Sequence, residues 1–313
     1  MTSVRVEAPA RLHLGMLDVV GGGTRRFGGL GVAVNRPATV VEASTSDDLT
    51  AEGPDAARAL AVARRCREAL GIAGGAHIRV LEAIPAHVGL GSGTKLALAT
   101  TMAVAALAGQ TPDPLAIARA AGRGTRSAVG LWTYVLGGLV VEGGVRPGVE
   151  RPAPLLARHA MPDDWYCVLA IPSAEPGLSG PAEEDAFTRL RPDATRAALI
   201  AQLVLTSLLP GLIERDLSEF GAALTRLQRL VGEAFAPIQG GVFHPRAGAL
   251  VDAMLGLGAA GAGQSSWGPT VYGVVAGEEA GRDLARRMEA ELAGGGRVEL
   301  VRFDNRGARV DVG

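Results

Sequence analysis

The chain has 313 residues, of which 48% are hydrophobic and 20% charged, and this composition excludes a largely disordered protein. Its 44 glycines follow no Gly-X-Y period, which excludes a collagen-like fold. Thirty-one basic and 32 acidic residues leave a net charge of -1, so no overall basic field exists to hold nucleic acid or an anionic membrane. We expect small-molecule substrates, no nucleic-acid partner and no membrane partner.

Signals for secretion, membrane insertion and metal–thiolate binding are weak. Residues 1–15 carry charges where a secretory signal would be apolar, and the longest apolar run, 96–109, is shorter than the roughly 20 residues of a membrane span. Cys66 and Cys167 lie far apart and outside any CxxC motif, which argues against a disulfide framework or a thiolate zinc site. We expect a cytoplasmic protein.

Hydrophobic periodicity in the first half predicts strands at 4–14, 30–41 and 77–82, a helix at 56–70, helices at 96–108 and 115–121, and a strand within 137–144. A glycine-rich, basic connection separates the first two strands. The Pro- and Arg-rich stretch 146–158 is typical of a linker, so we place a domain boundary near residue 160, between domains 1–160 and 161–313.

The second half alternates strands and helices, which predicts a mixed α+β domain. An irregular loop at 172–181 follows its first strand, and a glycine-rich loop at 261–270 precedes another. The predicted strands are 165–171, 271–275 and 297–303, and the predicted helices are 183–209, 214–233, 245–257 and 278–292.

Residues 85–95, Pro-Ala-His-Val-Gly-Leu-Gly-Ser-Gly-Thr-Lys, carry the strongest chemical signal. The order strand, glycine loop, helix aims backbone N–H groups and a helix dipole at an anion. The spacing fits neither a Walker loop nor the dinucleotide fingerprint, because Thr94 stands where each needs a glycine. A helix-capping turn is the alternative interpretation.

Lys95 ends this loop and is the only lysine of the chain, beside thirty arginines. An ammonium is a compact point charge that the planar guanidinium of arginine does not replace, so Lys95 is a candidate catalytic group. The alternative is a chance surface lysine.

Three segments, 8–15, 85–95 and 261–266, resemble in their order the three motifs of the superfamily of galactokinase, homoserine kinase, mevalonate kinase and phosphomevalonate kinase (GHMP kinases). The resemblance implies an α+β, two-domain GHMP kinase-like fold, with a ribosomal-S5-domain-2-like N-terminal half and a ferredoxin-like C-terminal half. Two departures weaken a kinase function. The central loop continues Ser92-Gly93-Thr94-Lys95 instead of Ser-Ser-Ala, and Gly130 stands where several of these kinases carry a catalytic Asp.

The same departures resemble one branch that is not a kinase family, the β-ribofuranosylaminobenzene 5′-phosphate synthases. The matching segments are 11–14, 87–94, 137–144, 177–180 with Glu183 and Phe187, and 263–269. The resemblance implies a pentosyltransferase of tetrahydromethanopterin biosynthesis. Such an enzyme condenses phosphoribosyl pyrophosphate with 4-aminobenzoate or 4-hydroxybenzoate and releases CO2 and pyrophosphate. It also implies Mg²⁺ as cofactor and a homodimer.

This chemistry assigns roles to residues of the glycine-rich segments, because a departing pyrophosphate needs cations and N–H donors and an aromatic acid needs a stacking surface. The predicted phosphate-binding residues are Gly89, Gly91, Ser92, Gly93, Thr94, Lys95, Arg123, Arg126, Gly263, Ser265 and Ser266. The predicted aromatic-acid-binding residues are Arg11, His13, His87, Trp132 and Trp267. The predicted catalytic residues are Asp18, Lys95 and Glu184, with Glu183 and Asp185 as candidate metal ligands.

Each role has a structural alternative: solvated arginines, ordinary turns, aromatic rings packed in a core, a buried structural histidine, or acidic residues at a helix start. For the whole chain, an ATP-dependent small-molecule kinase and a non-catalytic anion-binding protein stay open. The sequence does not choose between the amino and the hydroxy acid.

Overall fold

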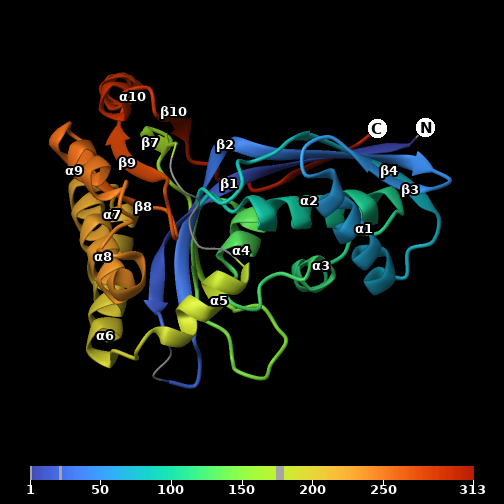
Figure 1. Cartoon of the computed structure of the whole chain (residues 1–313), viewed down its shortest axis with the longest axis horizontal. Coiled ribbons are helices and arrows are strands. Elements are labelled where there is room, and N and C mark those ends of the chain that lie inside the picture. Colours follow the sequence, from blue (N-terminus) through green and yellow to red (C-terminus); the bar gives the residue numbers. More distant parts are fainter. Residues whose placement is uncertain (1, 21–22, 174–179) are drawn as a thin grey trace.

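The computed structural model describes residues 2–20, 23–173 and 180–313, which form two sheets flanked by helices (Figure 1). The first sheet has seven strands in the order β11-β1-β2-β4-β3, with β5 and β6 continuing from β2. The second has four strands in the order β10-β7-β9-β8. The expected α+β class is therefore confirmed.

The elements follow the chain in this way. The first sheet contains β1 (Ser3–Asp18), β2 (Phe27–Ser46), β3 (Leu49–Glu52), β4 (Gly75–Glu82), β5 (Leu139–Glu142), β6 (Leu155–His159) and β11 (Arg309–Val312). Its helices are α1 (Ala56–Leu70), α2 (Ser92–Leu107), α3 (Pro114–Ala121) and α4 (Val129–Leu136). The second sheet contains β7 (Trp165–Pro172), β8 (Gly261–Gln264), β9 (Val271–Ala276) and β10 (Gly296–Arg302). The remaining helices are α5 (Gly180–Arg189), α6 (Ala194–Leu203), α7 (Leu209–Ile213), α8 (Leu217–Gln239), α9 (Gly248–Gly256) and α10 (Glu278–Leu292), with a π-helical turn, η1 (Val204–Leu208), between α6 and α7.

Strands β1 and β2 are long and belong to both halves of the molecule (Figure 1). Their antiparallel pairing shifts register between Pro9 and Ala10 and again between His13 and Gly15. Such irregularities bend a strand and are frequent beside functional sites. The second shift places His13 at the turning point between the two halves.

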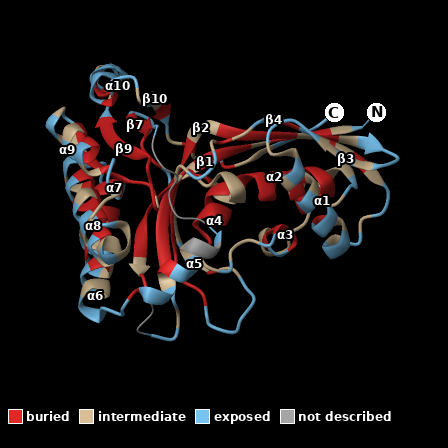
Figure 2. Ribbon diagram, in the orientation of Figure 1, coloured by how far each residue is buried: buried red, intermediate tan, exposed pale blue. Residues whose placement is uncertain are grey.

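Two large hydrophobic cores lie along these strands. Helices α1, α2 and α3 cover one part of the first sheet. Val6 and Val41 of the strands and Leu98 of α2 share the core between them. Farther along β1, Leu12 and Leu14 share a core with β7 and α8. Figure 2 shows that the buried residues follow the strands and α2, while the exposed residues lie on the outer helix faces. The two halves are therefore packed against a common pair of strands.

The end of the chain returns to the first sheet. Strand β11 pairs antiparallel with β1, and an isolated bridge joins Phe303 to Val34 of β2. The division expected near residue 160 falls between β6 and β7. The last residues of the chain, however, join the sheet that the first residues form. The domain boundary therefore stays a prediction.

Several short elements differ from the expectations. The single helix expected at 183–209 is broken, because Pro192 cannot continue a helix and Asp193 begins α6 by accepting a hydrogen bond from the Arg196 N–H at 2.9 Å. Strand β6 overlaps the end of the stretch interpreted as a linker, and β8 lies within the expected loop at 261–270. The sequence also missed β3, β11 and α4. Residues 174–179 of the expected loop lie outside the described residues.

Residues 194–213 are long and apolar enough to cross a membrane by length and composition alone, a test that core helices of soluble proteins also pass. The expected longest apolar run at 96–109 was thus not the longest apolar helical stretch. Ile200, Leu203 and Leu208 on it are buried in the core shared with α8. The stretch therefore contributes to the interior of this fold.

Candidate active site

The three motifs converge on the carbonyl oxygen of Gly89. Arg11 of β1 donates from Nη1 to this oxygen at 2.5 Å, and the Ser265 hydroxyl donates to it at 2.7 Å. The same hydroxyl accepts the backbone N–H of His13 at 3.0 Å. Ser265 is fully buried. Through these hydrogen bonds it joins the first strand, the glycine loop and the late loop at one point.

The glycine loop leaves the N-terminus of α2 open. Helix α2 is preceded by Gly91 in a left-handed conformation (φ 82°), and no side chain in the described part of the chain caps its first turn. Gly89 also has positive φ (91°), and a Cβ there would lie 2.2 Å from the carbonyl oxygen of Ser265. Ser92, Gly93 and Thr94 form the partly exposed first turn. An anion can therefore approach uncapped backbone N–H groups and the positive end of the helix dipole.

Arginines surround this helix end. Arg123 donates from Nη2 to the Gly93 carbonyl at 3.1 Å, and Nη2 of Arg58 lies 2.5 Å from where a Cβ on Gly93 would be. Burial, followed by the nearby Arg58 and Arg65, lowers the pKa of Arg123. The Nε atoms of Arg123 and Arg11 are buried without a hydrogen-bond partner among the described residues. Such unpaired donors beside an open helix end favour an anionic ligand.

Arg58 was missed as a site residue because the helical pattern places it with other arginines on an outward face. Its signal was its position on the first turn of α1, which the fold sets against the glycine loop. Asp55 pairs with it at 3.4 Å.

Lys95 turns into the protein interior. It is fully buried, donates to the Thr133 hydroxyl of α4 at 3.0 Å and lies 5.9 Å from the centre of the Tyr134 ring. Burial, with a smaller contribution from Arg11, lowers its pKa well below the usual value. It is not a surface lysine, and its side chain belongs to the packing between α2 and α4. A catalytic role for Lys95 stays a prediction.

Arg126 pairs with carboxylates. Its Nη1 lies 2.7 Å from Glu183 and its Nη2 3.5 Å from Glu184, and its guanidinium lies over the Phe187 ring. The indole N–H of Trp267 donates to Glu183 at 3.1 Å. Glu183, which pairs with Arg126, therefore holds Trp267 at the start of α5.

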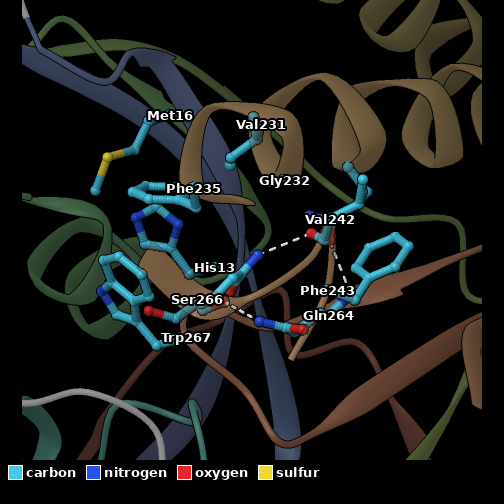
Figure 3. Close-up of a pocket in the computed structure, with 13 residues that line it drawn as sticks. His13, Met16, Val231, Gly232, Phe235, Val242, Phe243, Gln264, Ser266 and Trp267 are labelled. Atoms are coloured by element: carbon cyan, nitrogen blue, oxygen red, sulfur yellow. Dashed lines mark hydrogen bonds between the residues drawn. The ribbon is translucent and has the colours of Figure 1, made fainter. Parts of the chain in front are cut away.

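An aromatic pocket adjoins the late loop (Figure 3). Figure 3 shows His13, Phe235 and Trp267 gathered on one side and Phe243 on the other. The rings of Phe235 and Trp267 lie 4.5 Å apart. The pocket is lined by His13, Gly15, Met16, Gln228, Val231, Gly232, Phe235, Gln239, Val242, Phe243, Gln264, Ser266 and Trp267. Apolar walls with a few polar groups are typical of a small-molecule pocket.

Burial, with help from the Arg11 charge, lowers the pKa of His13 to about 3, so its ring is neutral at ordinary pH. The pocket thus contains two of the predicted aromatic-acid-binding residues, His13 and Trp267. The sequence missed Phe235 and Gln228, because their helical spacing on α8 is that of ordinary core residues.

The other predicted residues lie at the pocket, at the glycine loop or apart from both. Trp132 donates its indole N–H to Ala153 at 2.9 Å and packs with Val145, apart from the residues that line the aromatic pocket. His87 is exposed at the start of the glycine loop, and Arg11 lies beneath that loop. Gly263 packs against Gln228, and Ser266 adopts a positive φ of 56° beside the pocket. Asp18 accepts the Val20 N–H at 3.3 Å at the end of β1.

The expected metal ligands do not converge. Asp185 is exposed and pairs with Arg189 at 3.0 Å, whereas Glu183 and Glu184 pair with Arg126. Within residues 2–20, 23–173 and 180–313, no three His, Cys, Asp or Glu side chains are grouped as metal ligands. The described side chains thus offer no ready-made Mg²⁺ site. Residues 177–179 of the matching segment lie outside the described part.

Comparison with known proteins places these features in a family. The GHMP kinases N terminal domain matches residues 57–133, and the GHMP kinases C terminal domain matches residues 208–294. The solved homoserine kinase of Cytophaga hutchinsonii is similar to 99% of this chain and 97% of its own, with a TM-score of 0.74 at 21% identity. A solved mevalonate kinase of L. major gives a TM-score of 0.72 at 12% identity, covering 96% of each chain. These likenesses show the fold.

Curated relatives are more specific. The beta-ribofuranosylphenol 5'-phosphate synthase of Methanothermobacter thermautotrophicus is 32% identical, covering 97% of each chain. The protein of the same name from Archaeoglobus fulgidus is 33% identical, covering 99% of this chain and all of its own. Both relatives align with nearly the whole chain at more than 30% identity, and the two GHMP kinase domains match it as well. The chain therefore belongs to the β-ribofuranosylphenol 5′-phosphate synthase family.

Proposed function

We propose that this chain is a pentosyltransferase that joins the ribose of phosphoribosyl pyrophosphate to 4-hydroxybenzoate, with release of CO2 and pyrophosphate. One observation carries the proposal: Ser265 joins an open, arginine-surrounded helix end to an aromatic pocket. A reaction between a polyphosphate and an aromatic acid needs these two environments side by side. The relatives are named for a phenol product, which favours the hydroxy acid over the amino acid.

The donor is bound at the glycine loop. Negative charge develops on the pyrophosphate as its bond to ribose C1 breaks, and the first-turn N–H groups of α2 stabilise it there. Arg58 and Arg123 supply the cationic charge that the described loop lacks. The Lys95 side chain packs against α4, and its catalytic role stays a prediction.

The acceptor lies in the aromatic pocket. Its ring carbon attacks C1 of the ribose, and the pyrophosphate leaves with the electron pair of the broken C–O bond. The bond to the carboxylate then breaks, its electron pair returns to the ring, and CO2 departs. No oxidant or reductant is needed. Phe235 and Trp267 hold the ring, and the pocket excludes water from the electrophilic C1.

A kinase function fits the site less well. Gly130 occupies the place where several GHMP kinases carry an aspartate, and a Cβ on it would lie 2.8 Å from Cγ2 of Thr94. The packing at position 130 therefore leaves no room there for a carboxylate that would deprotonate an alcohol. The Mg²⁺ requirement, the homodimer and the cytoplasmic location stay predictions.

The first experiment measures CO2 and pyrophosphate release from phosphoribosyl pyrophosphate and Mg²⁺. Carboxyl-labelled 4-hydroxybenzoate and 4-aminobenzoate are tested in parallel, and ATP hydrolysis is followed separately. We expect equal release of both products with the hydroxy acid and no ATP consumption. ADP formation with an alcohol substrate would point to a kinase, and ligand binding without release from either acid would point to a binding protein.

A further inference from the structure

A buried carboxylate lies behind the aromatic pocket, and the function proposed above does not use it. Glu142 ends β5 and has no exposed surface. Its Oε2 accepts the Gly144 N–H at 2.7 Å, and its Oε1 accepts the Ala128 N–H at 3.4 Å. The Ser127 hydroxyl also hydrogen-bonds to this carboxylate. Every described partner of Glu142 is thus a donor, which suits the ionised form that the carboxyl takes above its pKa, which burial raises to about 7.

Ser127 connects this carboxylate to His13. The Ser127 hydroxyl oxygen lies 3.4 Å from Nε2 of His13, whose side chain is 7% exposed and lines the pocket. A serine hydroxyl has one proton. When that proton is donated to Glu142, the oxygen can only accept from the imidazole, so Nε2 must carry a hydrogen. The other ring nitrogen, Nδ1, then has a lone pair.

The lone pair has no partner within the described parts of the chain. Among the pocket's amides, Gln228 donates to Leu14 and accepts from Gln264, and Gln264 in turn bonds Ser266 and His244. Gln239 donates to Val242 at the half-exposed end of α8, where water can reach its oxygen. His13 therefore offers a buried acceptor to the pocket, and a buried acceptor left unpaired costs free energy.

We propose that Glu142, acting through Ser127, holds neutral His13 in the tautomer protonated on Nε2, so that Nδ1 accepts a hydrogen bond from a substrate hydroxyl. Glu142 and Ser127 are positioning residues, in the way that a carboxylate behind a histidine sets its tautomer in other sites. The hydroxyl can come from the aromatic acceptor or from the ribose of the donor. The substrate half of this inference rests on the proposed function, whereas the tautomer does not.

The tautomer is measured in the substrate-free protein. The chain has five histidines, and ¹⁵N-histidine labelling with long-range ¹H–¹⁵N correlation at pH 8 reports which nitrogen of each carries the proton. The His13 signals are those lost in His13→Gln. We expect His13 protonated on Nε2 and bare on Nδ1. A wild-type His13 protonated on Nδ1 would overturn the proposal.

Variants test which residues set the tautomer of His13. Ser127→Ala and Glu142→Gln should each convert His13 to a mixture of tautomers, whereas Ser127→Thr, which keeps the hydroxyl, should retain the wild-type state. Glu7→Gln is the matched control, because Glu7 lies on β1 as His13 does but pairs with Arg309 at 2.7 Å. Unchanged signals from the other four histidines show that a variant is folded. Wild-type tautomers in both Ser127→Ala and Glu142→Gln would contradict the inference.

Binding identifies the hydroxyl. Titrations compare 4-hydroxybenzoate with 4-methoxybenzoate, and phosphoribosyl pyrophosphate with its 2-deoxy and 3-deoxy analogues. We expect the wild type to prefer the hydroxyl in one of these comparisons by about tenfold, and Ser127→Ala to lose most of that preference. The set of ligands whose preference is lost in Ser127→Ala identifies the substrate that carries the hydroxyl. Equal preferences in wild type and Ser127→Ala would overturn the substrate half and leave the NMR result standing.

Discussion

The glycine loop and the aromatic pocket meet at Ser265, yet they are built in opposite ways. The loop, residues 89–94, presents backbone groups from one continuous segment, with positive φ at Gly89 and Gly91. The pocket gathers side chains from β1, α8 and the late loop. A backbone site should tolerate changes of its own side chains but not an added Cβ, whereas a side-chain site should respond to each ring it loses.

The largest expected effect follows from adding a Cβ to the loop. Gly89→Ala would place that atom 2.2 Å from the Ser265 carbonyl at φ 91°, so we expect turnover to fall about 100-fold and the unfolding free energy to fall by about 3 kcal/mol. Gly109→Ala is the control, because Gly109 also has positive φ (71°) but open space for a Cβ. Equal losses in both variants would show that backbone strain alone matters.

The buried carboxylate behind the pocket should make stability depend on pH. Burial raises the pKa of Glu142 to about 7 from 4.5, so between these values the folded protein keeps a proton that the unfolded chain releases. Stability therefore falls as pH rises across this window, by about 3 kcal/mol, relative to Glu142→Gln. Denaturant unfolding of both proteins at pH 4.5, 6 and 8 checks this. The titration of His13, present in both, cancels in the difference. Parallel stability profiles would argue against a raised pKa.

Removing one cation should weaken the loop's hold on the donor. We expect Arg123→Ala to raise the KM for phosphoribosyl pyrophosphate about tenfold, because a charge-assisted contact is lost, with little change in the KM for the aromatic acid. Arg64→Ala, an exposed arginine of α1, is the control. Steady-state kinetics at two salt concentrations measure both constants. If the aromatic acid's KM rose instead, the assignment of the loop to the donor would be wrong.

The two tryptophans separate the pocket from ordinary packing. Trp267 lies 4.5 Å from Phe235 and lines the pocket, whereas Trp132 is held by Ala153 apart from it. We expect Trp267→Leu to raise the KM for the aromatic acid about fivefold, and Trp132→Leu to lower stability without this change. The comparison fails if both variants change that KM alike.

The smallest effect should come from Lys95. Replacing this buried lysine by Met removes a desolvated amine while keeping the length of the side chain, so we expect a change in unfolding free energy within about 1 kcal/mol and nearly unchanged KM for the donor. Denaturant unfolding and donor kinetics measure it. A large loss of turnover with unchanged stability would support the catalytic role that its position after the glycine loop predicts.

Local signals in the chain were enough for much of the fold. Periodicity predicted the helix at 56–70 and placed most long strands, and the order of motifs indicated the GHMP fold before any contact was known. Short elements escaped, because β3, β8 and β11 have four residues each, too few to show a period. The break at Pro192 was readable, yet a continuous apolar pattern concealed it.

The sequence by itself determined the glycine loop before a helix and indicated the family. A glycine loop before a helix is a local property of consecutive residues, and its chemistry comes from backbone groups that any such segment presents. Only the tertiary structure decided that Arg58 faces this loop, that Lys95 turns inward and that Trp267 rather than Trp132 lines the pocket. It also decided that Glu142, Ser127 and His13 form one hydrogen-bonded series. These contacts join residues more than ten positions apart, so their distances depend on strand register and helix packing, which composition and spacing do not contain.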